Sequence, residues 1–462
     1  MLQGDVIENF TVEKLVNEGQ GFGRLDNFPV FVDYGAPGDI ADLKIIVKKK
    51  NYARARIAKL KTPSLDRADP PCPVFGLCGA CQWQHLQYSA QLKAKKSLIK
   101  EALERIGKMD SYLVEDVVGM EEPWNYRNKI AYPIKKIPNP NAKSQIKSQF
   151  QNPNRMREKI ILGYYRQETH DVVDIENCLI VHPMLNQAAQ ALKNIEFSVY
   201  DEKKHTGLAR HFIARHSLTE DAVVAGFSIN GETFPQAERL VEQLEKKINL
   251  KGFFININTQ QTNTILGEAN SLLFGESFLV EKINQLQLRF SFPSFFQVNP
   301  LATAKLYMLV EKLAELSGQE KVTDLYCGVG GLGLSLAGKA KPVTGLEENA
   351  FAIEDALENA SQNGIKNTSF IAGPVEKTIN ILEEKQDLII IDPPRVGISP
   401  FIIGEIIKNQ PRKIIYVSCN PATLARDLKI FCEASYKLKR IIPLDMFPQT
   451  YHVETIALLE FA

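Results

Sequence analysis

Asp387-Leu-Ile-Ile-Ile-Asp-Pro-Pro-Arg395 and Lys413-Ile-Ile-Tyr-Val-Ser-Cys-Asn-Pro421 decide the fold of the C-terminal region. Each stretch contains a short apolar run, the pattern of a strand that is buried on both faces. Each run ends at a chemically active residue, Asp392 in the first and Cys419 in the second. The carboxyl ends of parallel strands meet at one edge, where α/β folds bind ligands. A carboxylate and a thiol are therefore expected at the same edge of one sheet.

Outward from these two strands, the C-terminal region alternates between short apolar runs and helical segments such as 350–363. This alternation predicts an α/β fold with a doubly wound, parallel-rich sheet. The last two predicted strands, 438–444 and 455–461, follow one another without a long helix between them. The three other predicted strands are 322–326, 343–347 and 369–372.

The preceding chain divides into two further predicted domains, as 462 residues lead one to expect. Residues 1–62 contain short strands at about ten-residue spacing, which predicts a small β-barrel. A proline-rich linker follows. Residues 72–290 form an α+β central domain that includes a helix over 88–106, and residues 294–462 form the C-terminal domain.

Composition and charge narrow the class of protein. Apolar residues make up 44% and charged residues 24% of the chain, with a net charge of +1. No apolar run is long enough for a membrane span and no signal peptide is recognisable, so we expect a cytoplasmic protein that does not bind membranes. Two tracts are rich in Lys and Arg and contain no acid: Lys44 to Lys61 has eight cations and Lys135 to Arg157 has six. They allow an anionic partner such as RNA, although a solvated strand face and a solvated loop over 137–157 are the simpler readings.

A glycine-rich turn marks a candidate cofactor site. Asp324-Leu-Tyr-Cys-Gly-Val-Gly-Gly-Leu-Gly333 follows the first predicted strand of the C-terminal domain and precedes a helix. Dinucleotide binding is the obvious alternative, but the glycine spacing does not match G-x-G-x-x-G. Glu347, after the second strand, has the position of a ribose-binding carboxylate, and a helix N-cap is its simpler role. The combination resembles S-adenosylmethionine-dependent methyltransferases of the Rossmann-like class.

Three cysteines crowd into Cys72-Pro-Val-Phe-Gly-Leu-Cys-Gly-Ala-Cys81. Three thiolates on one loop indicate a metal site, and Cys178 is the candidate for a fourth ligand. Spacing alone favours zinc, whereas the ligand count fits an iron–sulfur cluster equally well.

Five motifs in a fixed order resemble one family, the RNA uracil-5-methyltransferases, in particular the iron–sulfur-containing enzymes that act on 23S ribosomal RNA. The first domain resembles the RNA-binding domain called TRAM, so the resemblance extends over nearly the whole chain. The motifs are Ser294-Phe-Phe-Gln-Val-Asn-Pro300, Asp324-Leu-Tyr-Cys-Gly328, Asp392-Pro-Pro-Arg395, Ser418-Cys-Asn-Pro-Ala-Thr-Leu-Ala-Arg-Asp427 and Asp445-Met-Phe-Pro-Gln-Thr-Tyr-His-Val-Glu-Thr455.

The resemblance implies a role for each matching residue. Cys419 is the expected nucleophile, which adds to carbon 6 of uracil so that carbon 5 can take a methyl group. Glu454 is the expected base that removes the carbon-5 proton. Gly331 departs from the family, where asparagine is common. The expected S-adenosylmethionine-binding residues are Gln297, Tyr326, Glu347 and Asp392, and the expected ligands of a 4Fe–4S cluster with a structural or RNA-docking role are Cys72, Cys78, Cys81 and Cys178.

The sequence leaves other interpretations open for several residues, for the substrate and for the function. An intracellular cysteine is most often a buried structural thiol, the reading kept for Cys327 and Cys432. Arg395 and Arg127 are candidates for binding phosphate or the target base, and equally for surface ion pairs. The rival substrate is a transfer RNA uridine. Rival functions are a non-catalytic RNA-binding or ribosome-assembly factor and an amino-methyltransferase, which would leave Cys419 without a purpose. A monomer is expected.

Overall fold

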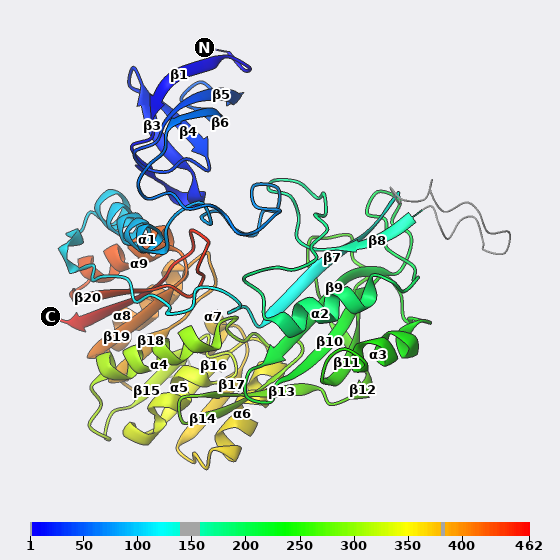
Figure 1. Ribbon diagram of the computed structural model, residues 1–462. Coiled ribbons are helices and arrows are strands. Elements are labelled where there is room, and N and C mark those ends of the chain that lie inside the picture. Colours follow the sequence, from blue (N-terminus) through cyan, green and yellow to red (C-terminus); the bar gives the residue numbers. More distant parts are fainter. Residues whose placement is uncertain (1, 139–157, 380–383) are drawn as a thin grey trace. The chain divides into compact units, whose positions relative to one another are not determined.

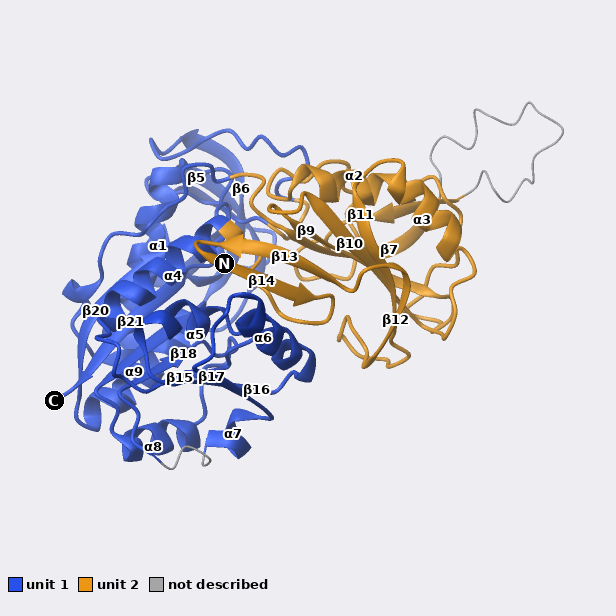
Figure 2. Cartoon of the chain, turned by 90° about the horizontal axis from the view of Figure 1, so that it is seen from below, with its two compact units in different colours: residues 1–76, 81–123, 301–462 blue, residues 77–80, 124–300 orange. Residues whose placement is uncertain are grey.

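The computed structural model describes residues 2–138, 158–379 and 384–462. They form two compact units, each of which is described by itself (Figure 2). The first unit contains residues 1–76, 81–123 and 301–462, and the second contains residues 77–80 and 124–300. The first unit therefore combines the predicted barrel and the C-terminal domain with 81–123, a segment that the sequence pattern places in the central domain.

The N-terminal strands form a six-stranded sheet in the order β1-β5-β6-β4-β3-β2 (Figure 1). Apolar side chains from alternate positions of these strands pack into one core, as a half-buried strand pattern requires. Gly23 is needed for close packing, because a Cβ at this position would stand 2.5 Å from the carbonyl oxygen of Thr11. The strands are β1 Val6–Thr11, β2 Lys14–Leu15, β3 Gly21–Leu25, β4 Phe28–Asp33, β5 Ile40–Lys48 and β6 Ala53–Thr62.

The C-terminal sheet has seven strands in the order β17-β16-β15-β18-β19-β21-β20. The five strands from β17 to β19 run parallel, and β21 pairs antiparallel with both β19 and β20. The predicted parallel-rich α/β fold is confirmed. The strands are β15 Val322–Leu325, β16 Val343–Glu347, β17 Thr368–Ala372, β18 Leu388–Ile391, β19 Lys413–Ser418, β20 Tyr436–Leu444 and β21 Glu454–Phe461.

Helices connect the parallel strands, and their starts follow capping rules. Side chains of Asn349, Ser399 and Asn420 accept a backbone N–H at the beginning of α6, α8 and α9. Helices α7, α8 and α9 share one apolar core with a face of the sheet, and α1 packs against α9. The helices are α1 Tyr88–Ala102, α4 Pro300–Ala314, α5 Gly331–Leu336, α6 Ala350–Gln362, α7 Val375–Thr378, α8 Pro400–Asn409 and α9 Pro421–Glu433.

The second unit contains a six-stranded sheet in the order β12-β11-β10-β9-β7-β8 and the separate hairpin β13-β14. Strands β9 and β10 are buried along their whole length. Helices α2 Pro183–Leu192 and α3 Ala237–Glu245 contact β9 and β11. The strands are β7 Lys129–Pro138, β8 Glu158–Leu162, β9 Ala209–Ser217, β10 Ala222–Ile229, β11 Leu250–Ile257, β12 Ala269–Gly275, β13 Phe278–Ile283 and β14 Leu286–Ser291.

Three sequence expectations concern a helix, the basic segment 137–157 and membrane spans. The helix predicted over 88–106 is present as α1 followed by a single π-helical turn, Leu103–Gly107. Most of the basic segment 137–157 lies outside the described residues. Within the described ranges, none of the helices combines the length and apolarity that crossing a membrane requires.

Candidate active site

Five chemically active side chains follow the order of the C-terminal strands at one edge of the sheet. Glu347 ends β16, Asp324 lies in β15, Asp392 follows β18, Cys419 follows β19, and Glu454 begins β21. Because β21 is antiparallel, its first residue lies at the carboxyl ends of the parallel strands. The register confirms this placement, since Ser418 pairs with Thr455.

Cys419 lines a small cavity of about 90 Å³ together with Arg395, Tyr451 and His452. Asn17, from the 3₁₀ turn between β2 and β3, also lines it. The Cys419 side chain is half-buried. Burial raises the pKa of the thiol to about 11, Glu454 and Asp392 raise it as well, and Arg395 lowers it. The thiol is therefore protonated at rest, and a nearby positive charge favours its thiolate.

Asn420 ties the two motif loops together. Its side-chain oxygen accepts the N–H of Ala422 at 3.1 Å and caps α9, while its Nδ2 donates to the carbonyl of Arg395 at 3.1 Å. Thr423 donates its hydroxyl to the same carbonyl at 3.3 Å. These bonds hold the loop after β18 beside the loop after β19, which brings Arg395 next to Cys419.

Glu454 and Asp392 are acids with raised pKa values, because their surroundings disfavour the charged form. Glu454 is only 3% exposed, and its Oε1 has no hydrogen-bond partner within the described chain. Burial and then the Asp392 charge raise the pKa of Glu454 well above its usual range, whereas Arg395 lowers it. Burial raises the pKa of Asp392 to about 7. A carboxylate with a raised pKa is a better proton acceptor once it is ionised.

We expect Arg395→Gln to shift the rising limb of the pH–rate profile of kcat/KM to higher pH. Arg395 lowers the pKa of both Cys419 and Glu454, so its removal raises both and leaves fewer molecules with a thiolate and a carboxylate at pH 7. Activity at pH 7 should fall several-fold and recover at alkaline pH. The charge-preserving Arg395→Lys is the control. If the pH–rate profile of Arg395→Gln is not shifted, Arg395 does not act on these two groups.

Two acidic side chains, Asp324 and Glu347, accept backbone N–H groups of the glycine turn. Gly333 donates its N–H to Asp324 at 2.8 Å, and Gly328 donates its N–H to Glu347 at 3.1 Å. Burial raises the pKa of Asp324 to about 7, against the hydrogen bond from Gly333, and the charges of Asp392 and Glu347 add to the rise. The Oδ1 of Asp324 is buried without a hydrogen-bond partner in the described chain. An orphaned buried acceptor beside a glycine turn fits a ligand that carries N–H donors or a positive charge.

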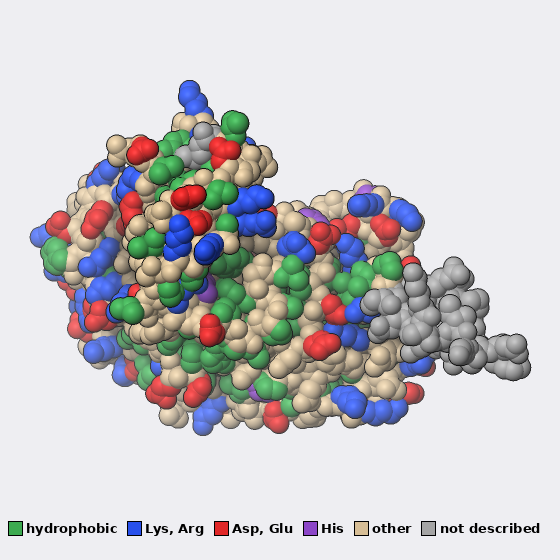
Figure 3. Space-filling model, turned by 45° about the horizontal axis from the view of Figure 1, so that its top comes forward, with side chains coloured by type: hydrophobic (Ala, Val, Ile, Leu, Met, Phe, Trp, Pro, Cys, Tyr) green, Lys and Arg blue, Asp and Glu red, His purple; other side chains and the backbone are tan. Residues whose placement is uncertain are grey.

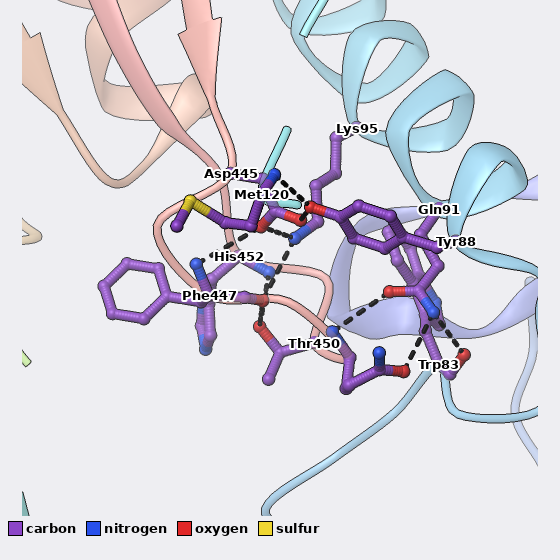
Figure 4. A network of polar contacts seen from close by, with 10 residues as sticks. Trp83, Tyr88, Gln91, Lys95, Met120, Asp445, Phe447, Thr450 and His452 are labelled. Atoms are coloured by element: carbon purple, nitrogen blue, oxygen red, sulfur yellow. Dashed lines mark hydrogen bonds and ion pairs between the residues drawn. The ribbon is translucent and has the colours of Figure 1, made fainter. Parts of the chain in front are cut away.

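A buried ion pair holds the loop that leads into Glu454 (Figure 4). Lys95 on α1 donates to Asp445 at 2.5 Å and to the carbonyl of Phe447 at 3.0 Å, and both charged side chains are fully buried. Tyr88 donates its hydroxyl to the other oxygen of Asp445 at 2.8 Å. Gln91 donates its side chain to that of Gln449 at 2.9 Å. Helix α1 thereby fixes the segment 445–453 over the Cys419 cavity.

We expect Lys95→Met to lower the free energy of unfolding by about 3–5 kcal/mol, because it leaves Asp445 charged and buried without its partner. Lys96→Met is a matched control on the same helix. Its partner Asp116 is 96% exposed, so water screens that pair and stability should hardly change. Denaturant unfolding of the whole chain measures both variants, and equal losses would contradict the prediction.

Comparison with known proteins agrees with this geometry. A family model described as tRNA (Uracil-5-)-methyltransferase matches residues 236–461, and the TRAM domain model matches residues 7–58. An RNA methyltransferase of Halalkalibacterium halodurans, itself uncharacterized, is 36% identical over 99% of this chain and 97% of its own length. A similarly named protein of Caldanaerobacter subterraneus is 40% identical over 97% of each chain. The chain belongs to the RNA uracil-5-methyltransferase family.

A solved structure of the same family supports the fold and the cofactor. The tRNA (uracil-54, C5)-methyltransferase of Pyrococcus abyssi, in complex with S-adenosyl-L-homocysteine, is 26% identical, with a TM-score of 0.73 over 98% of this chain and all of that one. This RNA uracil-5-methyltransferase is accordingly an S-adenosylmethionine-dependent enzyme. The orphaned Asp324 and the glycine turn fit that cationic methyl donor.

Of the four cysteines predicted to bind a cluster, Cys72 is half-buried, whereas Cys78, Cys81 and Cys178 are buried. Cys78 and Cys178 belong to the second unit, where both lie close enough to Tyr132 to raise the pKa of its hydroxyl, after the larger effect of burial. Cys72 and Cys81 belong to the first unit. A group of three or more metal-ligand side chains is not found among the described residues. The 4Fe–4S cluster therefore stays a prediction.

Three further residues singled out by the sequence are Gln297, Arg127 and Arg395, and they differ in burial and in their contacts. Gln297 is half-buried in the second unit. Arg127 stands 5.8 Å from the centre of the Tyr164 ring and donates to the carbonyl of Lys129. Arg395 is exposed, and its Nη2 lies 3.5 Å from Nε2 of His452. Neither arginine shows, in these contacts, the surface ion pair that the sequence left open.

Acids from outside the basic tract 44–61 neutralise part of it. Arg54 pairs with Asp33 at 2.7 Å, and Lys61 pairs with Asp42 at 2.8 Å. Lys48 stands 3.8 Å from the centre of the Phe28 ring. On the face shown in Figure 3, both Lys and Arg and Asp and Glu side chains are spread over the surface. Two of the eight cations of the tract, Arg54 and Lys61, are thus paired with acids that lie outside it.

Sequence reasoning missed the buried pair of Lys95 and Asp445. Asp445 begins the last of the five motifs, and the resemblance implies no role for it. The one available signal was a lysine on the face of α1 that also presents Ile99 to the core. A lysine at such a position needs a buried partner, which sequence alone does not identify.

Proposed function

We propose that this enzyme methylates carbon 5 of a specific uridine in 23S ribosomal RNA through a covalent adduct with Cys419. The observation that carries the chemistry is the register of β19 and β21, which sets Cys419 and Glu454 side by side at the edge that also holds Asp392. The cysteine motifs support the ribosomal substrate, since they resemble the iron–sulfur members of the family. A transfer RNA uridine is the alternative, because the solved relative acts on tRNA.

Each proposed role follows from the need to activate a pyrimidine carbon. The Cys419 thiolate adds to carbon 6, which makes carbon 5 nucleophilic. S-adenosylmethionine supplies the methyl group that carbon 5 takes up. Glu454 then accepts the proton from carbon 5, and the electron pair released expels the Cys419 thiolate from carbon 6. Arg395 favours the thiolate at the start and at the end of this cycle.

We assign the binding of S-adenosylmethionine to Gln297, Tyr326, Glu347 and Asp392. Glu347 already orders the turn by accepting the N–H groups of Gly328 and Asn349, at 3.1 and 2.9 Å. Tyr326 has a φ of +64°, an unusual conformation that the following glycine turn supports. Acids along this edge complement the positive sulfonium of the methyl donor.

RNA that contains 5-fluorouridine tests the mechanism and the substrate together. The fluorine at carbon 5 cannot leave as a proton, so the methylated adduct with Cys419 should persist. Total RNA from cells grown with 5-fluorouracil would be incubated with the enzyme and S-adenosylmethionine, and the attached nucleotide would be mapped by sequencing. A crosslink in 23S rRNA supports the proposal, whereas one in tRNA replaces its substrate. Absence of any adduct would overturn the mechanism.

We further propose that Cys72, Cys78, Cys81 and Cys178 bind a 4Fe–4S cluster. The support is the donor set of four cysteines, three of them within ten residues of sequence, and the proximity of Cys78 and Cys178 to one tyrosine. Anaerobically purified protein should be brown, with about four iron and four sulfide per chain. Cys178→Ser should lower both contents while Cys432→Ser leaves them unchanged. A colourless protein with one zinc per chain would contradict the assignment.

A further inference from the structure

Tyr307 lies outside every motif of the sequence, on α4, yet its side chain reaches the glycine turn. It is 6% exposed. A Cβ at Gly331 would stand 1.9 Å from the Tyr307 hydroxyl oxygen and 2.8 Å from Cζ. The hydroxyl thus occupies the space in which a side chain of residue 331 would begin.

The ring of Tyr307, and not the backbone, excludes a side chain from position 331. Gly328 and Gly330 have φ values of +52° and +81°, which favour glycine. Gly331 is absent from the left-handed residues and begins α5 with a helical backbone. Any amino acid could adopt that conformation, so the missing side chain at 331 makes room for the hydroxyl.

An unpartnered carboxylate oxygen lies beside this turn, in the neighbourhood of the Tyr307 hydroxyl. Asp324 Oδ1 is buried without a hydrogen-bond partner in the described chain, and the Tyr307 hydroxyl lies near enough for the Asp324 charge to act on it. Burial raises the pKa of Tyr307, and the charges of Asp324 and Asp392 raise it further. The hydroxyl is therefore neutral and lies among carboxylates. Buried polar atoms are nearly always paired, so the open acceptor of Asp324 indicates a ligand at this place.

We propose that Tyr307 binds the α-ammonium group of S-adenosylmethionine, supplying from α4 the polar contact that residue 331 cannot make. An ammonium has three N–H donors, which suits the Tyr307 oxygen and Asp324 Oδ1 as acceptors, and its charge complements Asp324 and Asp392. The proposal rests on the dependence on S-adenosylmethionine and is independent of which RNA is methylated.

Calorimetry on the full-length protein tests this role with two ligands and the variant Tyr307→Phe. S-adenosylhomocysteine carries the ammonium group, whereas 5′-methylthioadenosine lacks the whole amino-acid portion. The variant should bind S-adenosylhomocysteine about tenfold more weakly or worse, and methylthioadenosine as tightly as the wild type does. Its melting temperature should not fall, because phenylalanine keeps the buried ring. Unchanged affinity for S-adenosylhomocysteine, or an equal loss for both ligands, would overturn the proposal.

A second pair of variants tests the shared space. Gly331→Asn alone should weaken S-adenosylhomocysteine binding, because its Cβ collides with the Tyr307 hydroxyl. In the Tyr307→Leu background, which removes the hydroxyl and the end of the ring, the same change should strengthen binding, since the amide then reaches the vacated position. An effect of the same sign in both backgrounds would refute the exchange. The Tyr307→Phe measurement stands by itself if these variants fold poorly.

Discussion

Cys419→Ala is expected to lower methyl transfer by about 10,000-fold or more, the scale seen when a covalent nucleophile is removed. Without the thiolate, carbon 5 of the uracil gains no nucleophilic character, so a bound methyl donor has nothing to react with. The variant should also lose the adduct with 5-fluorouridine RNA. Tritiated methyl incorporation and denaturing gels measure these two effects.

Cys432→Ala is the matched control for this experiment. Cys432 is also a half-buried free thiol of the same unit, but its Sγ lies 3.8 Å from Sδ of Met109, away from the cavity. It should keep full activity and form the adduct. Binding of S-adenosylhomocysteine should survive in both variants, which separates a chemical defect from a folding defect. Residual turnover of more than a few per cent in Cys419→Ala would exclude covalent catalysis by this residue.

Glu454→Gln is expected to slow turnover by about 100- to 10,000-fold while letting the methylated adduct accumulate on ordinary uridine RNA. Glutamine keeps the size of the side chain but cannot accept the carbon-5 proton, so the Cys419 thiolate cannot leave. Addition itself should not suffer, because the Glu454 charge raises the pKa of Cys419 and its removal favours the thiolate. One round of methyl incorporation with a protein–RNA complex that survives denaturation is the signature.

Glu460→Gln provides a control on the same strand. Glu460 lies near the far end of β21, partly exposed and paired with Lys439 at 3.4 Å. Its neutralisation should leave turnover intact, which shows that the loss at Glu454 is not a general consequence of removing a charge from β21. If Glu454→Gln slows turnover without trapping the adduct, another group removes the proton.

Much of the site could be predicted because its signals are local. An apolar run followed by a polar residue identifies a strand and its end, and parallel strands share one edge, so the sequence predicts that Asp392 and Cys419 lie together. The cofactor turn was equally readable, since glycines after a strand have a local conformational cause. By contrast, which cations of the basic tract are paired could not be predicted, because ion pairs such as Arg54 with Asp33 join residues 21 apart in the chain.

The sequence by itself therefore determined the strands, the edge that carries the chemistry and the residues that end there, because short-range patterns encode each of these. Only the tertiary structure decided how distant segments complete the site. The antiparallel entry of β21 brings Glu454 to Cys419, and the pair of Lys95 and Asp445 joins residues 350 apart. Tyr307 fills the space of Gly331 from another helix. Such contacts depend on packing in three dimensions, and no local pattern records them.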